Sequence, residues 1–417
     1  MNTCVVGLNH GDEGKGKIVD LIAEDYDAIV RYNGGANAGH TVKVDDKTFK
    51  FHHVPSGCIA NPDAKIVLAG GMVINPLTLW EELQPLIKEG NISSSNILIS
   101  AKTHCVMPWH LAADIRKGGK IGTTKRGIGP CYADKAHRWN AIRLGDLLPK
   151  MKTEKMRDFF AVDQAFHGEG LWEKYYNAAR RITELLADTE SFLRDAVRNR
   201  TNVLFESANG FHLDIDHGTF PYVTSSAVGP AGIPQSCGLP NLHLDRIIGV
   251  IKCYATRVGE GPFPSEIISQ ADEREMSSPS APTSREWYKY TNKPYPKKEC
   301  EIAHLIRDKG KEYGTTTGRP RRIGWLDLMM TKEAVAGTGA TEIALMHNDT
   351  MANMGAFKYI DQHGERKEHE GWDDISSTSH KSYIRIIEDA LEIPVKTISY
   401  GAKRSQTSMF PKWHFES

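Results

Sequence analysis

The segment Gly11–Lys17 reads GDEGKGK and follows the apolar run TCVVGL. Its spacing matches GxxxxGK, in which glycines let backbone N–H groups point at phosphate oxygens and the following helix N-terminus adds positive potential. Lys15 and Lys17 add point charges. A simple glycine- and lysine-rich turn is the alternative, and the motif alone favours neither. The segment is therefore a candidate phosphate loop that needs support from the rest of the chain.

Two features separate this loop from a standard phosphate loop. Ile18 stands where a hydroxyl side chain usually holds magnesium, and the acidic pair Asp12–Glu13 lies inside the loop. A carboxylate beside phosphate is tolerated if it holds Mg²⁺ or takes a proton from the attacking group. Asp12 as a helix N-cap is the alternative. Capping does not explain a carboxylate buried among phosphate ligands, so the pattern favours a chemical role.

A second glycine-rich segment, Arg31–Thr41, reads RYNGGANAGHT. Its glycines permit close approach to a ligand, and Asn37 and His40 supply polar groups. A single His is more often structural than catalytic. Because His40 follows Gly39 in a loop that we expect to face the first one, an electrophilic or acid role is favoured.

The elements that position these loops follow from the hydrophobic pattern. Short β-branched and apolar runs alternate with amphipathic stretches. The predicted strands are Thr3–Leu8, Ala28–Tyr32, Lys65–Ala69, Asn96–Ser100, Asn202–Glu206, Gly249–Tyr254, Glu342–Met346 and Val395–Ser399. The predicted helices are Pro76–Glu89, Leu171–Asn199 and Tyr383–Glu392. This alternation favours an α/β fold with a large, mainly parallel central sheet flanked by helices, where sites gather at the carboxyl ends of strands.

The chain is expected to form one domain over residues 1–417, with a helical subregion at about 140–200. Segment 270–298 is rich in Ser, Pro and Lys and is interpreted as a surface insertion. Basic and acidic residues number 52 each, so no overall field draws the chain to nucleic acid or membrane. The sequence shows no hydrophobic secretory core and no run long enough to span a membrane, and its 7 cysteines include no CxxC pair. These features predict a cytoplasmic protein with reduced thiols.

Further motifs occur in order along nearly the whole chain, and together they resemble the adenylosuccinate synthetase family. The matching blocks are GDEGKGKIVDL (Gly11–Leu21), RYNGGANAGHT (Arg31–Thr41), PSGC (Pro55–Cys58), GTTKRGIGPCYADK (Gly122–Lys135), DIDHGTFPYVTSS (Asp214–Ser226), TRVGEGPFPSE (Thr256–Glu266), YGTTTGRPRRIGWLD (Tyr313–Asp327) and GWDD (Gly371–Asp374). Any one could arise by chance, whereas the ordered set identifies the chain as a member of this family.

The resemblance implies a C–N bond-forming ligase of purine nucleotide biosynthesis. It joins L-aspartate to IMP at the expense of GTP, through 6-phosphoryl-IMP, and gives adenylosuccinate, GDP and phosphate. The resemblance assigns Asp12 to removing the N1 proton of the purine and to binding Mg²⁺, for which Gly39 supplies a carbonyl. His40 matches the histidine that stabilises charge developing on the phosphates.

The resemblance also implies three sets of binding residues. The GTP-binding set is Gly11, Asp12, Glu13, Gly14, Lys15, Gly16, Lys17, Gly39, His40, Thr41, Arg321, His347, Asp349, Ser399 and Gly401. The IMP-binding set is Asp12, Lys15, Asn37, Ala38, Gly39, His40, Thr124, Arg138, Asn209, Thr224, Val258 and Arg319. The aspartate-binding set is Thr315, Thr316, Thr317, Gly318, Arg319 and Arg321.

Several of these assignments have plainer alternatives. Asp349 could be a helix N-cap instead of the carboxylate that reads guanine, and the arginines at 319 and 321 could form a solvated basic turn. Arg138 matches an arginine that reaches the 5′-phosphate across a subunit interface, which implies a homodimer. A GTP-binding relative without turnover is a further alternative, although it has no need of the base Asp12.

The chain departs from the family pattern mainly around the purine and the nucleotide. Asn209 stands where a glutamine is usual, and His347 replaces a lysine on the guanine-binding strand. Asn9 and His10 replace glutamine and tryptophan before the loop. These changes leave open a paralogue that joins aspartate to another purine nucleotide, such as dGMP or GMP. The presence of Asp12 favours IMP.

Overall fold

The fold is described from a computed structural model, which describes residues 1–44, 47–117, 122–153, 156, 170–269, 297–314 and 320–410. Its centre is a ten-stranded sheet in the order β18-β17-β14-β11-β1-β10-β2-β5-β7-β9. Neighbouring strands are parallel except β17 and β18. The predicted large, mainly parallel sheet is therefore confirmed.

The predicted strands all lie in this sheet, most within two residues of the expected bounds. The strands of the large sheet are β1 (Asn2–Gly7), β2 (Ala28–Arg31), β5 (Lys65–Leu68), β7 (Ile97–Ser100), β9 (Leu186–Ala187), β10 (Val203–Gly210), β11 (Arg246–Lys252), β14 (Glu342–Met346), β17 (Val395–Ser399) and β18 (Thr407–Met409). Smaller two-stranded sheets pair β3 (His40–Val44) with β4 (Lys47–Phe51), β6 (Val73–Ile74) with β8 (His104–Cys105), β12 (Tyr254–Arg257) with β13 (Arg322–Trp325), and β15 (Phe357–Ile360) with β16 (Arg366–His369).

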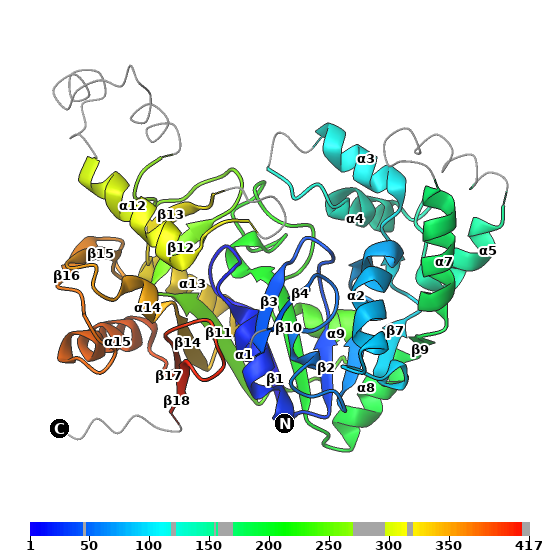
Figure 1. Cartoon of the computed structure of the whole chain (residues 1–417), viewed down its shortest axis with the longest axis horizontal. Helices are drawn as coiled ribbons and strands as arrows, with labels where there is room; N and C mark the ends of the chain where they lie inside the picture. The colour runs from blue at the N-terminus through cyan, green and yellow to red at the C-terminus, as the bar shows by residue number, and fades with distance from the viewer. Residues whose placement is uncertain are drawn as a thin grey trace.

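Helices flank the sheet, and α3, α4, α5 and α7 gather beyond one edge of it while α12–α15 lie at the other (Figure 1). The helices are α1 (Lys15–Ile22), α2 (Pro76–Lys88), α3 (Pro108–Lys117), α4 (Ile128–His137), α5 (Leu144–Met151), α7 (Leu171–Thr183), α8 (Thr189–Arg198), α9 (Gly232–Cys237), α12 (Lys297–Gly310), α13 (Leu328–Thr338), α14 (Asn348–Met351) and α15 (Thr378–Leu391). The single-domain organisation stays a prediction, and most of the predicted insertion lies outside the described residues.

The prediction of one continuous helix over Leu171–Asn199 is wrong. The chain forms α7, then β9 at the sheet edge, then α8. Asp188 begins α8 as its N-cap, because its carboxylate accepts the Ser191 N–H at 3.0 Å. The predicted helix from Tyr383 begins earlier, at Thr378, where Ser377 is the N-cap. Capping side chains, which the apolar period does not record, set both boundaries.

The sheet is buried on both faces, as a helix-covered parallel sheet requires. In β1, Cys4 and Val6 pack into one apolar core and Val5 into another that includes Ile18 and Val19 of α1. This packing holds α1 against β1 and so fixes both ends of the loop that joins them. No helix in the described parts of the chain is long and apolar enough to cross a membrane. All 7 cysteines are free and buried, as expected for reduced thiols.

Candidate active site

The loop between β1 and α1 has the backbone conformation that its glycines permit. Gly11 and Gly14 have φ of 86° and 99°, in the left-handed region that favours glycine. Asp12 also has a positive φ, 60°, which is uncommon for a residue with a side chain. Gly14 is the N-cap of α1 and no side chain caps this helix. The alternative that Asp12 merely caps the helix is therefore wrong.

Glu13 points into the protein from this loop, with 1% of its surface exposed. Its Oε1 accepts the N–H groups of Gly11 at 2.8 Å and Asn9 at 3.2 Å, and its Oε2 accepts Lys15 Nζ at 2.7 Å. The carboxylate fits because Gly7 has no side chain; a Cβ at that position would lie 2.2 Å from Oε2. Glu13 therefore orders the loop from inside, a role that its assignment to the GTP set did not anticipate.

The two loop lysines are both engaged with the protein. Lys15 is 3% exposed and pairs with Glu13. Lys17 Nζ donates to Ser399 Oγ at 2.7 Å and to the carbonyls of Gly401 and Gln406 at 2.9 and 3.1 Å. Burial lowers the pKa of Lys17 to about 8, against the attraction of Asp349. Lys17 thus ties the phosphate helix to the segment after β17 that the family pattern assigns to guanine.

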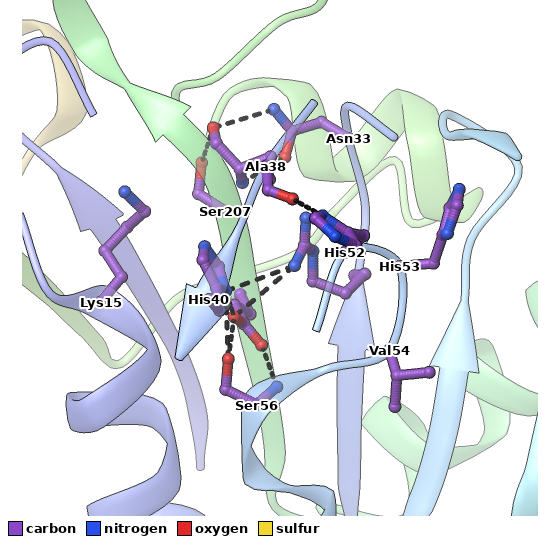
Figure 2. Close-up of polar contacts among 12 residues, drawn as sticks. Lys15, Asn33, Ala38, His40, His52, His53, Val54, Ser56 and Ser207 are labelled. Carbon is purple, nitrogen blue, oxygen red and sulfur yellow. Dashed lines mark hydrogen bonds and ion pairs between the residues drawn. The ribbon is translucent and has the colours of Figure 1, made fainter. Parts of the chain in front are cut away.

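His40 is backed by a buried carboxylate that sequence reasoning missed. Glu206, on β10, is fully buried, and its carboxylate contacts His40 Nδ1. It also accepts the Ser56 N–H at 2.8 Å and the Ser56 hydroxyl at 2.7 Å, and lies 3.6 Å from Arg31 Nη1. Figure 2 shows the cluster, with dashed lines joining Ser56 and His40. A hydrogen bond from Nδ1–H to Glu206 leaves Nε2 as the ring atom for other contacts.

The charges in this cluster are set by burial and by close partners. Burial alone would raise the pKa of Glu206, but His40, Arg31 and the Ser56 N–H lower it to about 2. Burial lowers the pKa of His40. Glu206 raises this pKa, whereas the positive charges of Arg31 and Lys15 lower it. Glu206 is therefore ionised at neutral pH, and its negative charge faces the fully buried Arg31.

The loop after β2 is held to the end of β10 by side-chain amides. Asn37 Nδ2 donates to Asn209 Oδ1 at 3.3 Å and to Thr224 Oγ1 at 3.2 Å, while its Oδ1 accepts the Gly35 N–H at 3.1 Å. The Ala38 carbonyl contacts His52 Nδ1 at 2.8 Å (Figure 2). Three residues of the predicted IMP set, Asn37, Asn209 and Thr224, thus meet in one cluster.

Asn209 has a φ of 65°, in the left-handed region of the backbone map. Asparagine adopts the left-handed conformation more readily than longer side chains because its short amide can hydrogen-bond locally. Its Oδ1 is engaged by Asn37, so its Nδ2 donors are the groups left for a purine acceptor atom. Asparagine is thus well suited to the backbone conformation at this position.

Asp12 is joined to a network of charged residues on the other side of the loop. Arg321 Nη2 lies 3.0 Å from Asp12 Oδ2, and Arg321 Nη1 lies 2.5 Å from Glu312 Oε2. Glu312 Oε1 accepts Lys252 Nζ at 2.7 Å and the Tyr254 hydroxyl at 2.6 Å. Asp12 and Arg321, singled out from separate motifs, are therefore direct neighbours.

The guanine end of the predicted site follows β14. Asp349 is exposed in the short helix α14, whose N-cap is His347, so Asp349 is not the N-cap of that helix. His347 Nδ1 lies 3.1 Å from the Tyr254 hydroxyl and 3.2 Å from Thr350 Oγ1. Burial lowers the pKa of His347 to about 4. Asn348 donates to the Ser399 carbonyl at 3.0 Å and so joins this turn to β17.

Three further groups of predicted residues are Thr124 with Val258, Arg138 alone, and the residues outside the described ranges. Thr124 and Val258 lie in exposed loops that approach each other, since a Cβ on Gly122 would lie 2.9 Å from the Gly259 Cα. Arg138 is exposed at the C-cap of α4 and contacts none of the predicted IMP residues in the described part of the chain. The predicted residues outside the described ranges are Thr315, Thr316, Thr317, Gly318 and Arg319.

A separate cavity of about 640 Å³ lies between the β3–β4 hairpin and α2. It shares no residue with the predicted sets, and its lining mixes both charges with aromatic side chains. The lining residues are Lys47, Thr48, Phe49, Lys50, Phe51, His52, Thr78, Glu81, Glu82, Pro85, Leu86, Glu89 and Arg126.

The donors present suit a magnesium ion shared with phosphate, not a metal held by protein alone. Among the described residues, no group of three or more His, Cys, Asp or Glu side chains could hold a metal. Mg²⁺ typically takes one or two carboxylates and completes its shell with waters and substrate phosphates. The Asp12 carboxylate, 32% exposed, and the Gly39 carbonyl fit that pattern.

Comparison with known proteins places this arrangement in a family. The family model described as adenylosuccinate synthetase matches residues 4–371. The chain is 37% identical to an adenylosuccinate synthetase from Thermosynechococcus vestitus, over 97% of this chain and 94% of that protein. It is also 37% identical to one from Malacoplasma penetrans, over 97% of both chains.

Solved structures agree. The fully ligated adenylosuccinate synthetase from Plasmodium falciparum superposes with a TM-score of 0.81 at 30% identity, over 98% of this chain and 99% of that chain. A succinoaminodeoxyadenylate synthetase from cyanophage S-2L, bound to dGMP and dATP, has a TM-score of 0.65 at 20% identity, over 99% and 95%, and shares the fold alone. The chain belongs to the adenylosuccinate synthetase family.

Proposed function

We propose that this protein is a GTP-dependent ligase that joins L-aspartate to IMP and releases adenylosuccinate, GDP and phosphate. The observation that carries the proposal is the position of Asp12. Its carboxylate lies in the phosphate loop, caps no helix, and is 3.0 Å from Arg321. A phosphoryl transfer to an ionised acceptor needs a base at this place, and the Asp12 carboxylate can serve as that base.

The chemistry begins at the purine. Asp12 takes the N1 proton of IMP, and the resulting O6 anion attacks the γ-phosphorus of GTP, so that GDP leaves. The amine of aspartate then attacks C6, and the C6–O6 bond breaks as phosphate leaves. Phosphorylation thus turns a poor leaving oxygen into a good one. Nδ2 of Asn209 is the donor we assign to the purine edge at O6.

Charge that develops on the phosphates is stabilised by fixed donors. We assign this role to the Nε2 side of His40, which Glu206 orients, and to the loop amides. One such donor is typically worth about 10²–10³ in rate. Asp12 and the Gly39 carbonyl would hold a Mg²⁺ ion, which would supply positive charge beside the phosphate oxygens.

Substrate selection is assigned to three regions of the chain. Asp349 accepts the N1 and N2 hydrogens of guanine, with Ser399 and Gly401 beside it. Residues 315–319, with Arg321, take the carboxylates of aspartate. We also propose a cytoplasmic homodimer in which Arg138, exposed at the end of α4, reaches the nucleotide phosphate of the partner subunit.

The test is an assay of the purified protein with Mg²⁺, GTP and aspartate, offered IMP, dGMP and GMP separately, with products identified by mass spectrometry. Adenylosuccinate from IMP alone is the expected result. A product from dGMP or GMP and none from IMP would make the chain a paralogue with a different acceptor. If no nucleotide is consumed under any condition, the protein is a binding relative and the proposal is wrong.

A further inference from the structure

Glu312 is a buried carboxylate to which neither the sequence motifs nor the proposed reaction gives a role. Its side chain is 0% exposed, and each carboxylate oxygen has a separate task. Oε1 accepts Lys252 Nζ at 2.7 Å and the Tyr254 hydroxyl at 2.6 Å, while Oε2 accepts Arg321 Nη1 at 2.5 Å. One face is therefore anchored to β11 and β12, and the other holds a guanidinium.

The backbone repeats this connection. The Arg321 N–H donates to the Glu312 carbonyl at 2.9 Å, and Tyr313 and Pro320 form an antiparallel bridge. The described residues on either side of 315–319 are therefore joined by both main chain and side chain. Burial would raise the pKa of Glu312, but Lys252, His347 and Arg321 lower it to about 2, so the carboxylate stays ionised at neutral pH.

Glu312 also determines which edge of Arg321 is turned toward Asp12. Nη1 is engaged by Glu312 and Nη2 faces Asp12 at 3.0 Å. Nε is buried and has no hydrogen-bond partner among the described residues. A buried N–H without a partner is costly, and the Nε and Nη2 edge of a guanidinium matches the two oxygens of a carboxylate or phosphate. This edge is thus oriented toward an oxyanion beside Asp12.

We propose that Glu312 is a positioning residue that holds Arg321 so that its Nε and Nη2 edge receives a substrate oxyanion next to Asp12. The inference rests on the proposed function. The oxyanion is a carboxylate of aspartate or the terminal phosphate of GTP, which share this chemistry. If Glu312 served only to neutralise the buried Lys252, its shortening would lower stability and leave the affinity for each substrate unchanged.

The test variant is Glu312→Asp, which keeps the charge beside Lys252 but shortens the side chain by one methylene. The matched control is Glu266→Asp, because Glu266 also forms an ion pair with an arginine, the adjacent Arg322, through its two oxygens at 2.7 and 2.6 Å. A second variant, Tyr254→Phe, removes one donor to Glu312 and leaves both ion pairs. KM for IMP, GTP and aspartate, kcat and the melting temperature are measured for each.

We expect Glu312→Asp to raise KM for one anionic substrate by about tenfold to a hundredfold, the effect of one lost charge-assisted hydrogen bond. A rise for aspartate identifies a carboxylate, and a rise for GTP identifies a phosphate. Tyr254→Phe should raise the same KM by a smaller factor. If Glu312→Asp does not fold, the KM values of Tyr254→Phe alone test the proposal.

The proposal is overturned if all KM values stay within about twofold of wild type in both variants, or if Glu266→Asp raises the same KM equally. A uniform loss of kcat together with a lower melting temperature also overturns it. An inactive wild-type protein contradicts the proposed function instead, so the two failures are distinguishable.

Discussion

Replacing Glu206 by glutamine removes the only carboxylate within ion-pair distance of Arg31 in the described part of the chain. Both side chains are 0% exposed, so the substitution leaves a buried guanidinium without a counter-charge. Breaking a buried ion pair in this way typically costs about 3–5 kcal/mol. The pKa of Glu206 gives a similar size, because a shift from 4.5 to about 2 corresponds to about 3 kcal/mol. We therefore expect Glu206→Gln to lose about 3–4 kcal/mol of the free energy of unfolding.

The assay is urea unfolding at pH 7 followed by tryptophan fluorescence and circular dichroism. Glu82→Gln is the matched control, because Glu82 is also a buried carboxylate that accepts backbone N–H groups, from His53 and Val54, but no arginine in the described residues pairs with it. It should lose only about 1–2 kcal/mol. Turnover of Glu206→Gln should also fall, since His40 loses the carboxylate that orients it. If Glu206→Gln is within about 1 kcal/mol of wild type, or no less stable than Glu82→Gln, the assignment of the buried charges is wrong.

The remaining predictions concern the purine site and acid stability. Asp12→Ala should lower kcat by about 10²–10⁴ while GTP binding, measured by calorimetry, is partly retained. Wild-type turnover would refute the base assignment. Asn209→Gln should improve or leave unchanged IMP turnover at a stability cost of about 1 kcal/mol, because its φ of 65° disfavours the longer residue; a large loss of turnover would mean that the pocket is built for another purine. Glu206 and Glu312 both have folded pKa values near 2, below the unfolded value of 4.5, so their stabilisation is present above pH 4.5 and is lost as the pH falls toward 2. Urea midpoints at pH 7, 4 and 3 should fall steadily, and less so in Glu206→Gln; parallel curves would contradict this.

Much of the fold could be predicted because buried parallel strands are continuous apolar runs. TCVVGL and EIALM gave the central strands β1 and β14 almost to the residue. The short edge strands were missed, since β9 and β18 have two and three residues and little apolar pattern. The break between α7 and α8 was missed because both sides have the same amphipathic period, and only the cap at Asp188 records it.

The site could be predicted in part for a related reason. Glycines and charged residues close together in the chain, as in GDEGKGK, identified the loop and Asp12. Partners that meet only through the sheet were invisible to sequence spacing. Glu206 contacts His40 from β10, and Glu312 contacts Lys252, which is 60 residues away in the chain. A glutamate directly after an apolar run, as in VLFES, is the signal that could have indicated the first of these, because a buried carboxylate needs buried donors.

The loop residues also show why a motif does not fix the direction of a side chain. Glu13 was grouped with the phosphate ligands, yet its carboxylate turns inward to the N–H groups of Gly11 and Asn9. Lys17 was expected to add charge at the phosphates and is bonded to Ser399. The first outcome depends on the space left by Gly7, and the second on Ser399 of β17, near the other end of the chain.

The most direct test of the central claim follows the purine oxygen. The protein is given IMP labelled with ¹⁸O at O6, together with GTP, aspartate and Mg²⁺, and the released phosphate is analysed by mass spectrometry. Because O6 attacks phosphorus and then leaves with it, one ¹⁸O should appear in phosphate for each adenylosuccinate formed. Adenylosuccinate accompanied by unlabelled phosphate would contradict the account.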